Sequence, residues 1–129
     1  MPNYVKNTVK IKDKDPNRME KVFKAIDDNI EQYSNRGCSF NFFNSLVPFP
    51  DAKTLTDIRN YWGASRIYDM EILNRTDDSI EIKYDTNWES SLPFCKRLAQ
   101  QGYKVYLKVR YCEDNSINNP YQRMKLVKN

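Results

Sequence analysis

The sequence predicts an α+β protein, a ferredoxin-like sandwich in which an antiparallel sheet of four to five strands carries two helices on one face. Three observations predict this class. Residues 79–112 alternate like a strand, then follow a helical spacing, then alternate again; residues 4–33 repeat a strand and a helix; and further alternation lies between these units. The apolar faces of the strands and helices are buried against each other, which gives a two-layer domain.

Residues 79–112 form the clearest unit. The core-facing residues expected in its two strands are Ile80, Ile82 and Tyr84, and then Val105, Leu107, Val109 and Tyr111. Between the strands, Phe94, Cys95, Leu98 and Ala99 recur at helical spacing. Gly102 stands where this helix should end, because glycine adopts positive φ without a Cβ penalty. Such a crossover returns right-handed over one face of the sheet.

The N-terminal unit begins with a strand over Tyr4–Lys12. Its predicted apolar face contains Val5, Asn7, Val9 and Ile11, and its basic face contains Lys6, Lys10 and Lys12. Asp15 followed by Pro16 predicts a helix start, because the carboxylate caps free N–H groups and proline is tolerated at the first position. The apolar face through which this helix is expected to pack on the core consists of Met19, Val22, Phe23, Ile26, Ile30 and Tyr33.

The middle of the chain is less regular. The aromatic run at 38–43 predicts a second strand that ends near Leu46, and the prolines at 48 and 50 predict extended backbone. Residues 52–60 are ambiguous and allow a short surface helix capped by Asp51 or Thr54, and 68–73 alternate like a strand. The predicted order is β-α-β-β-β-α-β. We therefore expect one domain over 1–112, with an inserted arm at about 47–66, and a polar, basic tail over 113–129.

Composition limits the function classes. The chain has a formal charge of +4 and a pI near 8.9, which permits nucleic-acid binding without requiring it. It has no histidine, and its three cysteines have no ligand-like spacing, so we expect no metal site and no cofactor. No apolar run is long enough for a membrane helix or a signal peptide. We expect a cytoplasmic protein with reduced thiols.

Several motifs occur in the order seen in one family of small phage and plasmid proteins, the YubB type. The matching segments are Met1-Pro2-Asn3-Tyr4 with Asn7-Thr8-Val9 and Ile11, Phe40-Asn41-Phe42-Phe43-Asn44 with Val47-Pro48-Phe49-Pro50, Trp62-Gly63-Ala64-Ser65-Arg66, and Tyr84-Asp85-Thr86-Asn87-Trp88-Glu89-Ser90-Ser91-Leu92-Pro93. They resemble the family's MPNW, F-N-F-N…I-P-x-P, W-G-T-K-W-D and F-x-T-A-W-S-P-P elements. The resemblance implies a ferredoxin-like fold, an origin in a mobile element and no established catalysis.

The residues themselves do not favour an enzyme. General acid–base catalysis at neutral pH needs histidine or a carboxyl group with a raised pKa, and a nucleophile needs a partner base. Ser90 and Ser91 precede a predicted helix and are expected to cap it. Glu81 and Asp85 share a strand face, where pairing with lysines such as Lys83 is the simpler interpretation.

The candidate binding surface is the sheet face that the two predicted helices leave uncovered. The first and last strands are neighbours in this fold and place a basic stripe on it: Lys6, Lys10, Lys12, Lys104, Tyr106, Lys108 and Arg110. The other strands place Asp69, Glu71, Glu81 and Asp85 on the same face. A basic stripe with an aromatic side chain is typical of nucleic-acid binding, whereas lysines on a sheet also simply prevent aggregation.

A face that is basic on one side and acidic on the other suits a protein with the opposite pattern better than a polyanion. Together with the absence of a recognisable catalytic set, this pattern favours a non-enzymatic binding protein. The mobile-element resemblance further implies that it acts in the cytoplasm of a host cell by inhibiting a host protein or protein complex, with host defence machinery such as a CRISPR effector complex as the expected class of target. A nucleic-acid-binding module is the alternative, and a self-complementary face also allows a homodimer. Trp62 and Trp88 are expected to anchor loops to the core rather than to contact a partner.

Overall fold

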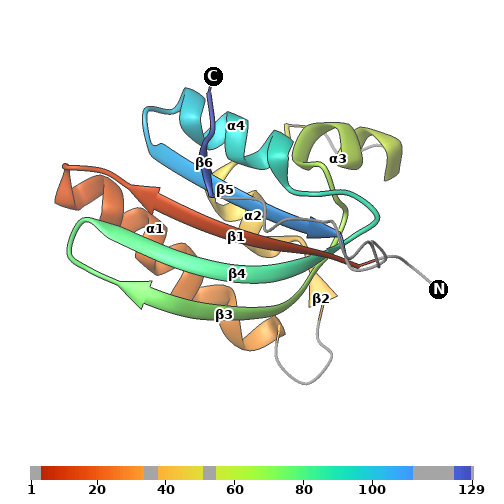
Figure 1. Ribbon diagram of the computed structural model, residues 1–129, viewed down its shortest axis with the longest axis horizontal. Helices are drawn as coiled ribbons and strands as arrows, with labels where there is room; N and C mark the ends of the chain where they lie inside the picture. Colours follow the sequence, from red (N-terminus) through yellow and green to blue (C-terminus); the bar gives the residue numbers. More distant parts are fainter. Residues whose placement is uncertain (1–3, 34–37, 51–54, 112–123, 129) are drawn as a thin grey trace.

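The computed structural model describes residues 4–33, 38–50, 55–111 and 124–128, which include an antiparallel sheet in the order β2-β3-β4-β1-β5-β6 (Figure 1). Its strands are β1 (Tyr4–Lys12), β2 (Cys38–Ser39), β3 (Ile67–Arg75), β4 (Ser79–Asn87), β5 (Lys104–Tyr111) and β6 (Lys125–Leu126). The four long strands, in the order β3-β4-β1-β5, have the pairing of a ferredoxin-like fold, so the predicted fold class is confirmed.

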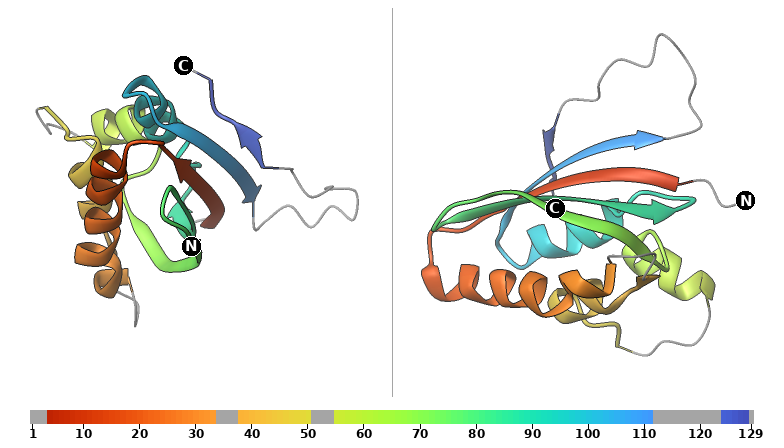
Figure 2. Two further views of the ribbon diagram at one scale, coloured as in Figure 1. Left: turned by 90° about the vertical axis from the view of Figure 1, so that its left-hand side faces the viewer. Right: turned by 90° about the horizontal axis from the view of Figure 1, so that it is seen from below.

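The helices all lie on one face of this sheet (Figure 2). They are α1 (Pro16–Asn29), which continues into a short 3-10 turn η1 (Ile30–Tyr33), α2 (Asn41–Leu46), α3 (Leu55–Trp62) and α4 (Leu92–Gln100). The prediction of two helices on one face is correct for α1 and α4, and α2 and α3 extend the same layer. The opposite face, which we call the outer face, has no described helix over it.

The start of α1 follows the predicted capping chemistry. The Asp15 carboxylate accepts a hydrogen bond of 2.9 Å from the backbone N–H of Asn17, and Pro16 occupies the first turn. Met19, Val22 and Ile26 are fully buried against the sheet. Gly102 ends the α4 segment with a φ of +102°, as predicted for a residue without a Cβ.

The predicted strand over 38–43 is wrong beyond its first two residues. Only Cys38 and Ser39 pair with β3, and the chain then forms helix α2. In this helix Phe42, Phe43 and Leu46 share one buried face, and the backbone N–H of Phe42 donates to the Tyr33 hydroxyl at 3.0 Å. Aromatic residues favour strands only through their packing, so packing against the core decides this segment.

The predicted arm at about 47–66 contains α3, the short helix that the sequence left open; its predicted caps, Asp51 and Thr54, lie outside the described residues. Trp62 anchors this segment, as predicted. Its indole is 1% exposed and donates to the Val47 carbonyl at 2.9 Å. Of the predicted tail over 113–129, the described part is 124–128, where β6 pairs with β5 and the buried Val127 donates its N–H to the Val105 carbonyl.

The strict alternation predicted for 68–73 is wrong, because β3 contains two irregularities. Its register against β4 shifts between Tyr68 and Glu71 and again between Ile72 and Asn74. Asp69 lies at the first shift with a φ of +52°. Met70 and Ile72 face the core and Glu71 faces outward, as predicted, whereas Tyr68 lies opposite Asp85 on the outer face, a local departure typical of a β-bulge.

A buried polar network joins β1 to the corner between β4 and α4. The Asn7 amide nitrogen donates to the Val5 carbonyl and to Thr86 Oγ1, and its Oδ1 accepts from both the N–H and the hydroxyl of Ser91. Ser91 Oγ also lies 2.7 Å from the Tyr84 hydroxyl. Of the two serines predicted to cap α4, Ser91 occupies the N-cap position, but its side chain makes no capping bond and instead connects the network. The Ser90 hydroxyl accepts from the Leu92 N–H at 3.3 Å.

Candidate functional site

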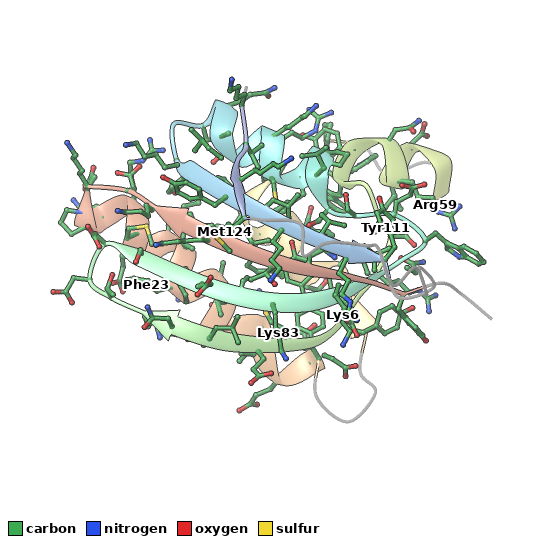
Figure 3. The ribbon with its side chains drawn as sticks, in the orientation of Figure 1. Lys6, Phe23, Arg59, Lys83, Tyr111 and Met124 are labelled. Carbon is green, nitrogen blue, oxygen red and sulfur yellow. The ribbon has the colours of Figure 1, made fainter. Side chains whose placement is uncertain are left out.

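The outer face of the sheet carries the predicted binding residues in the predicted arrangement of strands. We call it the bipolar face and define it by Tyr4, Lys6, Lys10, Lys12, Tyr68, Asp69, Glu71, Glu81, Lys83, Asp85, Lys104, Tyr106, Lys108 and Arg110. Figure 3 shows Lys6 and Lys83 projecting from this face, away from the helices. In β1 and β4 the residues that alternate with these outward side chains are buried, so each of the two strands has one core face and one outer face.

The basic half of the bipolar face comes from β1 and β5, which pair directly. Their register places Lys6 opposite Arg110, Lys10 opposite Tyr106, and Lys12 opposite Lys104. Directly opposed residues lie within about 5.5 Å at Cβ, so these side chains form one continuous stripe. The prediction that these residues form a basic stripe with Tyr106 within it is therefore correct for their positions on the sheet.

The acidic half comes from β4 and β3 and is partly neutralised. Asp85 lies opposite Lys6, and Glu81 lies opposite Lys10. The predicted cross-strand pairing with Lys83 is present, since its ammonium group lies 3.2 Å from a Glu71 carboxylate oxygen. Both partners are half exposed, so this pair contributes at most about 1 kcal/mol to stability. Polarity thus runs across the strands, from the cations of β5 to the carboxylates of β3.

At the acidic end, Tyr4, Tyr68, Asp69 and Asp85 line a hollow of about 350 Å³. The two tyrosine rings meet edge to face with their centroids 5.3 Å apart. Burial raises the pKa of Asp85 above its ordinary value, and the negative charge of Asp69 adds to this shift. Lys6 and Lys83 act in the opposite direction without cancelling it. Asp85 is therefore the carboxyl group of this hollow that accepts a proton more readily than in an unfolded chain.

Replacing Asp85 by asparagine is expected to leave the protein as stable at pH 7 or to stabilise it by up to about 0.5 kcal/mol. A raised folded-state pKa means that stability falls as pH rises through that pKa, and the amide of the variant has no charge to bury. The gain should vanish at about pH 2.5, where the wild-type carboxyl is almost fully protonated in both states. Urea midpoints at the two pH values measure this.

The control for that prediction is Glu81→Gln, which also removes one carboxylate from β4, opposite Lys10. If Asp85→Asn lowered the urea midpoint at pH 7 but not at the acid pH, the attraction between Lys6 and the ionised Asp85 would outweigh the burial of the carboxylate.

The bipolar face contains two aromatic residues that the sequence analysis did not place there, Tyr4 and Tyr68. Tyr4 is 39% exposed at the start of β1. Its position in the outward register of Lys6 was a usable signal, whereas the outward turn of Tyr68 depends on the irregular register of β3. The prediction for Trp88 is wrong: this side chain is 45% exposed and is not a core anchor. Its backbone has a φ of +70°, which the sequence does not indicate.

The hollow has one element of acid–base chemistry, a carboxyl group with a raised pKa. Its other described lining residues are two tyrosines and a second aspartate, and none of these four is a histidine, cysteine or serine that would complete a nucleophilic set. Cys95 is fully buried, and burial raises the pKa of its thiol to about 12, so it is not an activated nucleophile.

The described residues contain no cluster of three or more His, Cys, Asp or Glu side chains arranged to hold a metal ion. No helix among them combines the length and the apolar character needed to cross a membrane.

Comparisons with protein-family models, curated proteins and solved structures found no match to this chain. The resemblance of its motifs to the YubB type therefore stays a prediction.

Proposed function

We propose that this chain is a non-enzymatic binding protein that inhibits a host protein by covering its surface with the bipolar face. The observation that carries this proposal is the ordered separation of charge across the sheet, with Lys104, Lys108 and Arg110 on β5 and Asp69 and Glu71 on β3. Complementary charge on a partner fixes the orientation of docking and speeds the encounter.

The aromatic residues of the face support the same proposal. Tyr4 and Tyr68 line the hollow at its acidic end, and Tyr106 lies within the basic stripe. Tyrosine is enriched among the residues that dominate protein interfaces, because it offers a large apolar ring with a polar tip. A host defence complex, a CRISPR effector included, is the proposed class of target, and the host cytoplasm is the proposed location. Both follow from the mobile-element resemblance.

Nucleic-acid binding is the second candidate, favoured by the stripe of cations on β1 and β5. A polyanion crossing the face would also meet Glu71, Glu81 and Asp85, each of which repels phosphate. The two candidates therefore respond oppositely to the acidic half: removing its negative charge should weaken a complementary protein interface and should strengthen phosphate binding.

The test uses three variants of the full chain. Lys104→Glu/Lys108→Glu reverses the basic half, Glu71→Lys/Glu81→Lys reverses the acidic half, and the combined variant keeps the formal charge of +4. A photo-crosslinking amino acid at Tyr106 should capture a polypeptide from host lysate, and the same group at Glu20, on the exposed side of α1, is the matched control. All three charge variants should lose that crosslink.

The same variants are titrated with single- and double-stranded DNA and RNA at about 50 and 200 mM salt, a range over which phosphate contacts lose affinity steeply. If Lys104→Glu/Lys108→Glu abolishes salt-dependent binding while Glu71→Lys/Glu81→Lys strengthens it, the nucleic-acid function replaces the proposal. A crosslink of equal yield from Tyr106 and Glu20 would also contradict it, because no face would then be selective.

A further inference from the structure

A second candidate site lies on the helix side of the sheet, at the corner between β4 and α4. Trp88 occupies this corner with a φ of +70° and an exposed side chain. A bulky residue seldom adopts this conformation, so the surrounding bonds must impose it. The hydroxyl of Thr86 donates to the Glu89 carbonyl at 2.6 Å, and the Glu89 N–H donates to the Asn87 carbonyl at 2.8 Å.

The two ends of the corner are also fixed to the rest of the fold. The Asn87 side chain accepts from the Arg66 N–H and donates to the Ser65 hydroxyl. Beyond Trp88, Ser91 belongs to the buried network of Asn7. The corner is therefore rigid on both sides of a residue that projects a large aromatic ring into solvent. Rigid presentation reduces the entropy that a binding partner would have to overcome.

Trp88 borders a cleft of about 730 Å³, which we call the Trp88 cleft and define by Arg59, Trp88, Glu89, Leu92, Pro93 and Tyr111. Leu92 is 38% exposed and Tyr111 is 42% exposed, so three large apolar side chains from the corner, α4 and β5 remain in contact with water. Figure 3 shows Arg59 and Tyr111 at the same end of the molecule. These side chains give the cleft an apolar wall that a ligand could cover.

Arg59 supplies the polar part of the cleft. Its Nε is buried and has no hydrogen-bond partner in the described structure. Buried donors in folded proteins are nearly always paired, so an unpaired guanidinium N–H beside a cleft indicates an acceptor that is brought by a ligand. Carboxylates fit the planar fork of arginine best among the groups that proteins carry. Glu89 also borders the cleft and disfavours a ligand with several negative charges.

We propose that the Trp88 cleft binds a short segment of a partner protein in which a single carboxylate stands next to a large apolar side chain. The apolar side chain packs against Trp88, Leu92 and Tyr111, while the carboxylate accepts from Arg59. Tryptophan, tyrosine and arginine are the residues enriched at the energetic centres of protein interfaces. This site lies outside the bipolar face, so it stands even if that face has another role.

The experiment follows the indole N–H signals of the full chain by NMR. Trp62 is buried and Trp88 is exposed, and Trp88→Phe assigns the two signals. The probes are two capped hexapeptides with the sequences Gly-Gly-Phe-Asp-Gly-Gly and Gly-Gly-Phe-Asn-Gly-Gly. The aspartate peptide should shift the Trp88 signal saturably, with a Kd of about 1 mM or below, and the asparagine peptide should bind about 10-fold more weakly. The Trp62 signal should not move.

Arg59→Gln should remove the difference between the two peptides, because neither side chain then meets a cation. Arg75→Gln is the matched control; it removes an arginine that pairs with Asp27 at the far end of β3, outside both the bipolar face and the Trp88 cleft, and should preserve the discrimination. An unchanged Trp62 signal reports that each variant is folded. The proposal is overturned if the Trp88 signal does not shift up to about 5 mM peptide, or if both peptides bind the wild type equally. It is also overturned if oligo(dT) shifts Trp88 and the aspartate peptide does not, since the cleft would then stack a base.

Discussion

Replacing Gly63 by alanine is expected to lower the free energy of unfolding by about 3 to 5 kcal/mol, a loss at the upper end for a single methyl group. Gly63 has a φ of +94°, where any residue with a Cβ is strained. A Cβ built there would lie 2.1 Å from the backbone oxygen of Ser90 and 2.7 Å from Cδ of Pro93. Both belong to the start of α4, which cannot move without disturbing the buried network at Ser91.

Gly102→Ala is the matched control for this prediction. Gly102 has a similar φ of +102°, yet its nearest neighbour is the end of the Arg18 side chain at 3.1 Å, which can move. Its substitution should cost only about 1 kcal/mol, the strain of the backbone alone. Urea unfolding followed by circular dichroism compares the two. If Gly63→Ala also cost only about 1 kcal/mol, the backbone at Ser90 would have to move aside for the new methyl group, and the expected steric clash would be wrong.

Replacing Asn7 by alanine is expected to destabilise the protein by about 3 kcal/mol. The amide of Asn7 is fully buried and satisfies the N–H of Ser91 at 2.8 Å, the Ser91 hydroxyl at 2.9 Å and Thr86 Oγ1 at 2.9 Å. Alanine would remove these three bonds together with the bond to the Val5 carbonyl, and it would leave the polar atoms of Ser91 and Thr86 buried. The loss therefore exceeds that of an ordinary hydrogen bond, because the desolvation of several groups is no longer compensated.

The control for Asn7 is its neighbour Thr8, which lies on the outer side of the same strand. Thr8→Ala should change stability by less than about 1 kcal/mol, since it affects only strand propensity. Differential scanning calorimetry at matched pH gives both values. If Asn7→Ala destabilised the protein no more than Thr8→Ala, a water molecule would have to take the place of the amide and satisfy the polar atoms of Ser91.

The predictable part of the fold is the part that depends on local periodicity. The alternation in Tyr4–Lys12 and in β5 indicated which residues face the core, and Asp15 with Pro16 located the start of α1. Tyr111 is the exception: it was expected to face the core, but at the end of β5 its side chain is 42% exposed. The basic stripe followed because β1 and β5 are necessarily neighbours in this topology. These features need only the period of a strand or helix and the handedness of its connection.

The features that could not be predicted depend on tertiary contacts or on unusual backbone angles. Helix α2 forms because Tyr33 and the core receive Phe42 and Phe43, contacts that an aromatic run does not specify. The exposure of Trp88 depends on a positive φ held by bonds from Thr86 and Asn87. At Asp69 a signal was present, because aspartate tolerates this conformation better than most residues, although it does not locate a bulge by itself.

The direction of polarity on the bipolar face restricts how two copies of the chain could meet through it. Suppose that two faces stack about a two-fold axis that runs parallel to the strands. The β5 cations of one copy then lie over the β3 carboxylates of the other, and the contact repeats itself on both sides. An axis perpendicular to the strands would place cations over cations. Any symmetric dimer built on this face must therefore align the strands of its two subunits with its symmetry axis.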